Sequence, residues 1–258
     1  MAGLLYKDFV AMRGKRFVLV ITILTFVYIV FRMLFPGNSE LEGFMIRNED
    51  GETVNLIDSL FFIGEFYMLW FGCYFINTWG QKIITTDNKS KIRSYLLSMP
   101  FSKKNYVASK YIFVAAFAYA IFSIYVIWHV VSLAFMGNSF NKDFSYLVTG
   151  FSIPLVCLTL FVTAIEMPMF LIWGKGKAMM VKVTIIMAIG IAAIGYVFFG
   201  NLNVFEQLDI WLLIKWAEAH EIELALLSIL SPMFTILFYY LSYRVALNFY
   251  EKKEEYDE

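Results

Sequence analysis

Charged side chains are scarce in this sequence of 258 residues, of which they make up only 16%. Ordinary soluble domains contain about 25% charged residues, so a soluble chain, whose surface needs charge, is excluded. The 21 basic residues are balanced by 21 acidic ones, and this lack of a basic excess argues against a nucleic acid partner. Cysteine is rare as well. Cys73 and Cys157 both lie in apolar stretches, where packing rather than a disulfide is expected.

The sequence also lacks the motifs of several enzyme classes. The nearest approach to a phosphate-binding P-loop, at 174–177, has neither the required spacing nor the hydroxyl. His129 and His220 are far apart, and neither belongs to an H-E-x-x-H zinc motif. We interpret His129 as a packed or hydrogen-bonded residue. No G-x-S-x-G nucleophile elbow occurs. We therefore expect a chain that is not an enzyme and that binds no metal or cofactor itself.

Apolar residues, in contrast, make up 60% of the chain. They form six stretches, each near the ~20 residues that cross a bilayer as a helix: 17–35, 59–79, 111–136, 146–173, 183–200 and 222–243. The predicted fold class is an all-α polytopic membrane protein, with a transmembrane domain of six helices over 17–243. Pro154 and Pro168 in the fourth stretch and Pro232 in the sixth predict bent or broken helices.

The segment 1–16 has an apolar face at helical spacing, formed by Leu5, Phe9 and Met12. Lys7 lies opposite this face and Asp8 on its flank. This pattern predicts an amphipathic elbow helix that lies in the membrane interface before the first span. The alternative is a frayed polar leader.

Basic residues are unevenly distributed. Four segments, 1–16, 81–110, 174–182 and 244–258, hold 17 of the 21 Lys and Arg residues. Cytoplasmic loops are enriched in Lys and Arg, so these segments, and with them both termini, are predicted to be cytoplasmic. The opposite loops carry twelve acidic residues. Six spans return the chain to its starting side, which agrees with this orientation.

Two carboxylates, Glu65 and Glu166, fall within predicted spans. A charged group at membrane depth costs several kcal/mol, so it normally faces protein or a wet cavity. Both residues are candidates for a substrate path or a gating contact. Both also lie about two turns from the end of their span, so an interfacial position is the alternative.

The loop 81–110 contains a second amphipathic pattern. Ile92, Tyr95, Leu96 and Met99 share one helix face. Asp87 is able to cap the start of this helix or to pair with a lysine one turn later, and the residue before Pro100 disfavours helix, so the helix ends there. Its apolar face either rests on lipid headgroups or docks on a soluble partner.

Two features concern helix packing and the outer surface. Ala188, Ala192 and Gly195 form a stripe of small residues that lets helices approach closely, within one protomer or at a dimer seam. The segment 201–221 carries apolar and aromatic residues on one side and predicts an interfacial helix at the outer surface. This helix serves as an aromatic belt or as an outer gate.

The loop resembles the first cytoplasmic loop of ABC type 2 exporter permeases. The matching features are the L-x-S-x-P segment at 96–100, the basic stretch that follows it, and Lys110 at the head of the third span. The elbow helix, the six spans and the loop after the fifth span occur in the same order. In its small size and in being a separate permease, the chain looks most similar to the permeases of phenol-soluble-modulin-type peptide exporters.

This resemblance implies a separate soluble ABC ATPase that binds ATP and Mg²⁺, and a second permease subunit in a homo- or heterodimer. The loop helix would be the coupling helix that docks on the ATPase, through Asp87, Lys89, Ile92, Arg93, Tyr95, Leu96 and Met99. Lys175 and Lys177 would make a second, smaller contact. The cargo would be an amphipathic or hydrophobic substrate, a peptide above all, exported across the bacterial cytoplasmic membrane. The competing hypotheses are a membrane-embedded peptidase and a non-transporting immunity or scaffold protein.

Overall fold

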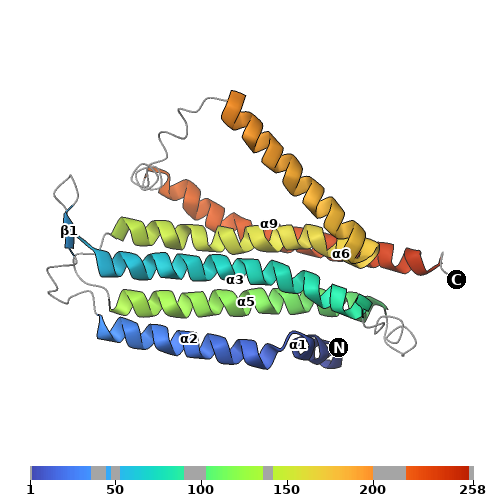
Figure 1. Cartoon of the computed structure of the whole chain (residues 1–258), viewed down its shortest axis with the longest axis horizontal. Helices are drawn as coiled ribbons and strands as arrows, with labels where there is room; N and C mark the ends of the chain where they lie inside the picture. The colour runs from blue at the N-terminus through green and yellow to red at the C-terminus, as the bar shows by residue number, and fades with distance from the viewer. Residues whose placement is uncertain are drawn as a thin grey trace.

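A computed structural model describes residues 2–35, 45–47, 53–89, 103–135, 142–199 and 219–255. Its elements are the helices and strands labelled in Figure 1: α1 (Ala2–Ala11), α2 (Gly14–Leu34), β1 (Met45–Arg47), β2 (Thr53–Asn55), α3 (Leu56–Lys89), α5 (Lys103–Ala134), α6 (Lys142–Phe199) and α9 (Glu221–Glu255). The described chain is therefore almost entirely helical, as predicted. The antiparallel pair of three-residue strands β1 and β2 was not anticipated.

The long helices form one bundle. α3 packs between α5 and the first part of α6, and α9 lies against α6. The β1–β2 pair lies at one end of the bundle. The opposite end gathers α1, the end of α3, the start of α5, a bend in α6 and the end of α9 (Figure 1). The two ends of the described chain thus lie on the same side of the bundle.

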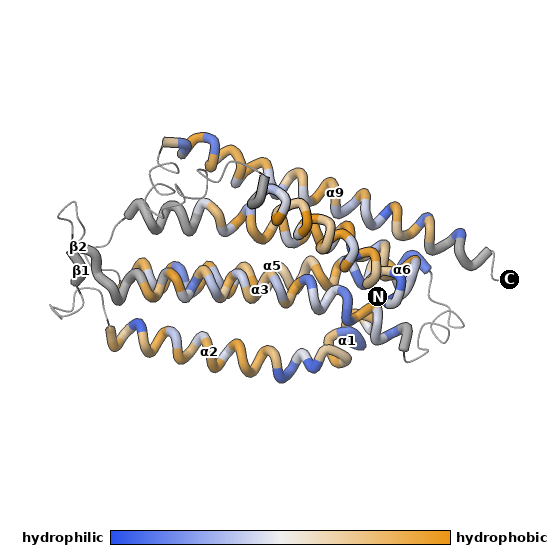
Figure 2. The backbone as a smooth tube through the Cα atoms, turned by 45° about the horizontal axis from the view of Figure 1, so that its top comes forward, coloured by the Kyte–Doolittle hydropathy of each residue, from blue (hydrophilic) through white to orange (hydrophobic). Residues whose placement is uncertain are grey.

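Four stretches are long and apolar enough to cross a membrane: Gly14–Leu34, Lys103–Ala134, Gly150–Tyr196 and Ile222–Phe249. Apolar residues run along all the long helices (Figure 2), and many large apolar side chains are exposed, as expected for a protein whose solvent is lipid. The chain is a multi-pass membrane protein. The predicted stretch 59–79 lies within α3, and 146–173 and all described residues of 183–200 lie within α6. The number of six crossings stays a prediction.

The prediction of a loop over 174–182 is wrong. Within α6 only Gly174 has non-helical backbone angles, and the chain is helical before and after it. Gly174 has a left-handed backbone with φ 71°, which glycine adopts without a steric penalty. The chain reverses there, and the second part of α6 leaves the bundle at an angle (Figure 1).

The prolines do not break their helices, since α6 continues through Pro154 and Pro168 and α9 through Pro232. A bend at these positions stays a prediction. A proline lacks the N–H that would bind the carbonyl four residues earlier. For Pro154 that carbonyl belongs to Gly150, and it accepts a hydrogen bond from the Ser228 hydroxyl at 3.1 Å. For Pro168 it belongs to Ala164, which accepts from the hydroxyl of Ser242. Two serines of α9 therefore satisfy the backbone groups that the prolines of α6 leave free.

A helix is present in the predicted elbow segment as α1, and its position in the membrane interface stays a prediction. Leu4, Asp8 and Met12 are buried, whereas Leu5 and Phe9 are only half-buried. The inward face is therefore centred on an acidic residue, because Asp8 has an ion-pair partner in α5. After α1 the chain turns at Arg13, and α2 begins at Gly14.

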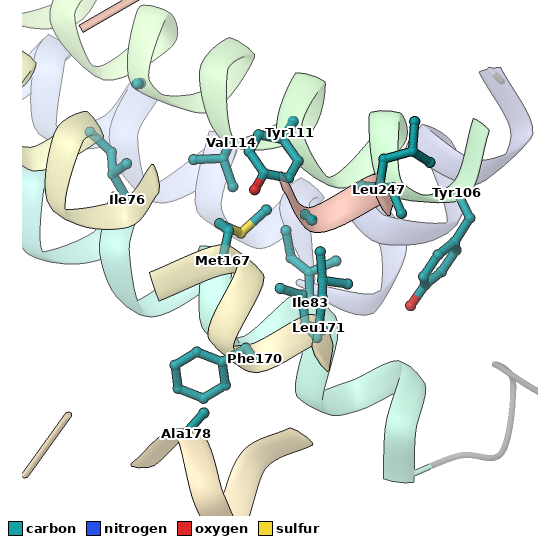
Figure 3. Packing of buried hydrophobic residues seen from close by; sticks show 14 of the residues in the cluster. Ile76, Ile83, Tyr106, Tyr111, Val114, Met167, Phe170, Leu171, Ala178 and Leu247 are labelled. Carbon is teal, nitrogen blue, oxygen red and sulfur yellow. The ribbon is translucent and has the colours of Figure 1, made fainter. Parts of the chain in front are cut away.

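The main apolar core lies toward the end of the bundle that holds α1. Side chains of α3, α5, α6 and α9 interlock there, among them Ile83, Tyr111, Met167, Leu171 and Leu247 (Figure 3). In lipid no hydrophobic effect drives helices together, so this close packing supplies the attraction. Cys73 and Cys157 are buried and free, as predicted for packing residues.

Candidate functional site

Four charged side chains meet at the end of the bundle that holds α1. Lys110 of α5 contacts Asp8 of α1 at 2.7 Å and Asp87 of α3 at 2.5 Å. Lys7 contacts Asp87 at 2.5 Å and Asp8 at 3.3 Å. Tyr106 adds a hydrogen bond from its hydroxyl to Asp87, at 3.3 Å. We call Lys7, Asp8, Asp87 and Lys110 the elbow cluster.

The elbow cluster contains two positive and two negative charges, so it is balanced. Asp8, Asp87 and Lys110 are almost fully buried, and Lys7 is one-quarter exposed. Burial lowers the pKa of Lys7, but the hydrogen bond with Asp87 and the charges of both aspartates outweigh it, so the pKa is raised above its ordinary value. Unpaired buried charges are costly, so the cluster fixes α1 to α3 and α5.

Asp87 therefore lies elsewhere than the sequence suggested. It is inside α3, which continues to Lys89, so no helix begins at Asp87, and its carboxylate points into the bundle. Lys89 ends α3. The other five residues of the proposed coupling helix lie outside the described part of the chain: Ile92, Arg93, Tyr95, Leu96 and Met99. Their docking role stays a prediction.

Glu166 lies in a second polar cluster, which spans the bend in α6. Its carboxylate pairs with Lys182 at 2.8 Å. It also accepts hydrogen bonds from Asn77 at 3.0 Å and Gln81 at 2.6 Å, both in α3. Glu166 is buried, whereas Lys182 is partly exposed. The carboxylate thus faces protein, and the cluster holds the two parts of α6 and α3 together.

The remaining predicted residues of α6 are more open. Lys175 and Lys177 are exposed directly after the bend. Ala188 and Ala192 are exposed, and a Cβ added to Gly195 would meet no atom within 4 Å. The stripe of small residues therefore does not pack against another described part of the chain.

Glu65 lies in a third polar cluster, nearer the opposite end of the bundle. Its Oε2 is 3.0 Å from Nδ1 of His129 in α5, and its Oε1 accepts a hydrogen bond from Tyr28 of α2 at 2.5 Å. Ser132 also donates to Oε1. Arg32 donates to the Ser132 carbonyl at 3.1 Å. The prediction that His129 is hydrogen-bonded is confirmed.

This third cluster does not resemble a hydrolase site. In a catalytic triad the imidazole lies next to the nucleophilic hydroxyl and the carboxylate lies behind it. Here the carboxylate of Glu65 lies between the Ser132 hydroxyl and the His129 ring. Among the described residues no group of three His, Cys, Asp or Glu side chains is placed to hold a metal ion.

Sequence reasoning singled out Glu65, Glu166 and, in another role, Asp87, but it missed Asp8 and most of the partners in these clusters. Asp8 is the single acid in the basic segment 1–16, and that exception was the available signal for a buried pair. Arg32 and Glu65 are both charges at membrane depth, which rarely lie apart from protein. Tyr28 and Ser132 offered no signal, because hydroxyls are common in spans.

The sequence comparisons agree with this architecture. The family described as ABC-2 family transporter protein matches residues 57–251, from the first turn of α3 to the last turns of α9. No curated protein and no solved structure matches the chain. An apolar bundle whose buried charges are paired within the protein is what a membrane component of a transporter requires. Since the match covers most of its length, the chain belongs to the ABC-2 family of transporter proteins.

Proposed function

We propose that this chain is the transmembrane permease subunit of an ATP-driven exporter in the bacterial cytoplasmic membrane. Membership of the ABC-2 family over residues 57–251 is the observation that carries the proposal. The chain contains no P-loop, so a separate soluble ATPase would bind ATP and Mg²⁺. The cargo would be an amphipathic peptide or hydrophobic molecule, as in the phenol-soluble-modulin-type exporters, whose permeases this chain resembles in its small size.

The arrangement of the bundle supports a docking end for the ATPase. α3 ends at Lys89 and α5 begins at Lys103, so both helices lead directly into the segment 90–102. The exposed Lys175 and Lys177 directly follow the bend in α6 at Gly174, and this bend lies at the same end of the bundle (Figure 1). Most basic residues of the chain belong to this end, which is the pattern of a cytoplasmic face.

Movement of a docked ATPase would reach several helices at once. A push on segment 90–102 acts on α3 and α5 together, because the segment connects them. The elbow cluster then transmits the displacement to α1, since Lys110 and Asp87 both bind residues of α1. A second permease subunit would complete the path, and the exposed stripe Ala188, Ala192 and Gly195 supports its placement at a dimer seam.

The test is co-purification with the ATPase encoded by the neighbouring reading frame. Interface energy is concentrated in a few apolar and aromatic anchors, so Tyr95→Asp combined with Leu96→Asp is expected to reduce the bound ATPase at least tenfold. Thr53→Asp in β2, at the opposite end of the bundle, is the matched control and is expected to leave binding intact. Undiminished binding and ATP turnover in the double variant would overturn the docking assignment.

A further inference from the structure

An apolar groove lies between α2 and α5. Its volume is about 610 Å³, and its walls are almost entirely apolar, with Thr22 and Thr25 as the polar exceptions among the lining residues. α2 contributes Val18, Thr22 and Ile29, and α5 contributes Ala116 and Ala120. The clusters described above do not use this groove.

α2 is tied to the rest of the bundle at two places along the groove, and residues of both ties help to line it. Close to its start, the Phe17 ring packs against Trp79 and Phe117 at centroid distances of 4.6 and 5.2 Å. Further along, Trp128 donates a hydrogen bond to Thr25 at 3.0 Å and stacks on Tyr28. The groove runs between these two ties and continues past the second one, since Val18 and Ile29 both line it.

The facing wall of α5 is lined by small residues. Ala116 and Ala120 are one helical turn apart and both are exposed. Small residues at this spacing normally let helices approach closely, but here α2 does not fill the space. An empty apolar groove that opens into the hydrocarbon layer would lose packing contacts along its walls. We therefore expect an apolar molecule to occupy it.

The groove has the length of one bilayer leaflet. Phe17 and Ile29 both line it, and twelve residues of helix extend about 18 Å. Half of a hydrocarbon core is about 15 Å. An acyl chain that enters from one membrane surface therefore fits along the groove.

We call the end of the groove at the start of α2, where Phe9 and Phe17 line it, its mouth, and basic residues are its neighbours in the sequence. Lys15 precedes Val18 by three residues and Thr22 by seven, so it shares the helix face of α2 that lines the groove. Its side chain is exposed. Arg13 and Arg16 are exposed beside it. The only nearby acid in the sequence, Asp8, is buried and paired with Lys110. The mouth thus offers positive charge to a headgroup phosphate.

We propose that the α2–α5 groove is a binding site for an anionic phospholipid, with one acyl chain between the two helices and the phosphate at Lys15. The occupant comes from the leaflet that faces the basic end of the bundle. Bound lipid fills the gap between the two ties and so stabilises the position of α2.

The test uses the purified full-length chain with phosphatidylglycerol or phosphatidylcholine of identical acyl chains, and native mass spectrometry counts the bound lipid. The chain is expected to retain at least fivefold more phosphatidylglycerol than phosphatidylcholine. The double variant Ala116→Leu, Ala120→Leu fills the groove and is expected to reduce this retention at least tenfold. Lys15→Gln is expected to remove the preference for phosphatidylglycerol. The control is Ala115→Leu, on the α5 face that lines a different groove. It is expected to change neither the retention of phosphatidylglycerol nor the preference for it.

Two results would overturn the proposal: unchanged phosphatidylglycerol retention in the double variant, or equal retention of both lipids by the wild-type chain. A dimer that dissociates in the double variant while lipid retention persists would instead make the groove a protein contact. A measurement on the wild-type chain avoids any folding defect. Phosphatidylglycerol with a photoreactive group in its acyl chain is expected to label peptides of α2 and α5 that line the groove, and labelling confined to other helices would contradict the site.

Discussion

The Ser228 hydroxyl of α9 donates a hydrogen bond to the Gly150 carbonyl of α6 at 3.1 Å. This is the carbonyl that Pro154, four residues later, leaves without its helical partner. The arrangement repeats fourteen residues further along both helices, where Ser242 donates to Ala164, the residue four positions before Pro168. Both prolines are thus accommodated by hydroxyls of one neighbouring helix, and α6 and α9 are joined in a fixed register.

The first prediction concerns this proline compensation. Ser242→Ala is expected to lower the free energy of unfolding in detergent by about 1 kcal/mol, because hydrogen bonds between spans contribute about 0.6–1.7 kcal/mol. In a Pro168→Ala background the same change is expected to cost less, since the restored N–H binds the Ala164 carbonyl. Ser123→Ala is the control, because its hydroxyl binds a carbonyl of its own helix. Strictly additive effects of the two substitutions would contradict the compensation.

The second prediction concerns the pair formed by Glu166 and Lys182. In a straight helix sixteen residues would separate them by about 24 Å, but the reversal at Gly174 brings them within 2.8 Å. A double-mutant cycle with Glu166→Gln and Lys182→Met is expected to give a coupling energy of about 1–2 kcal/mol. Chemical denaturation in mixed micelles measures it. A coupling near zero would mean that the pair does not hold the two parts of α6 together.

The third prediction concerns the elbow cluster. Lys110→Met leaves two buried carboxylates, Asp8 and Asp87, with Lys7 as their remaining cation, and loss of one partner of a buried pair costs about 3–5 kcal/mol. We expect a large fall in the melting temperature. Adding Asp8→Asn to this variant is expected to restore part of the loss, because one uncompensated charge disappears.

The matched control for the elbow cluster is Lys82→Met. Lys82 lies on α3 and is exposed, so its replacement is expected to change stability by no more than about 0.5 kcal/mol. Equal effects of Lys110→Met and Lys82→Met would show that the cluster does not fix α1 to the bundle.

The fourth prediction concerns the bend at Gly174. Its backbone has φ 71° and ψ 177°, a region that essentially glycine alone occupies and that costs another residue about 1–3 kcal/mol, so Gly174→Ala is expected to destabilise the chain by about that amount. Gly176 lies two residues later in helical conformation, and Gly176→Ala is expected to be neutral or stabilising by up to about 1 kcal/mol. A Cβ at either position meets no atom within 4 Å, so thermal unfolding of the two variants compares backbone strain alone.

The sequence by itself determined that this is a helical membrane protein and where most of its apolar stretches lie. Composition and hydropathy suffice for this, because a segment in lipid must satisfy its own backbone and is therefore a helix. The sequence also identified Glu65 and Glu166 as unusual, since charge at membrane depth is costly wherever it occurs.

Only the tertiary structure decided what these residues contact. Asp8 and Lys110 are 102 positions apart, and no local pattern reveals that α1 presents an aspartate to α5. The sequence located the break in α6, because its apolar stretch ends at 173 and the break falls at Gly174. Only the structure showed that Ser228 and Ser242 of α9 satisfy the carbonyls that the prolines release, so that α6 continues through both prolines. Pairing between helices depends on their packing, and packing depends on all helices at once.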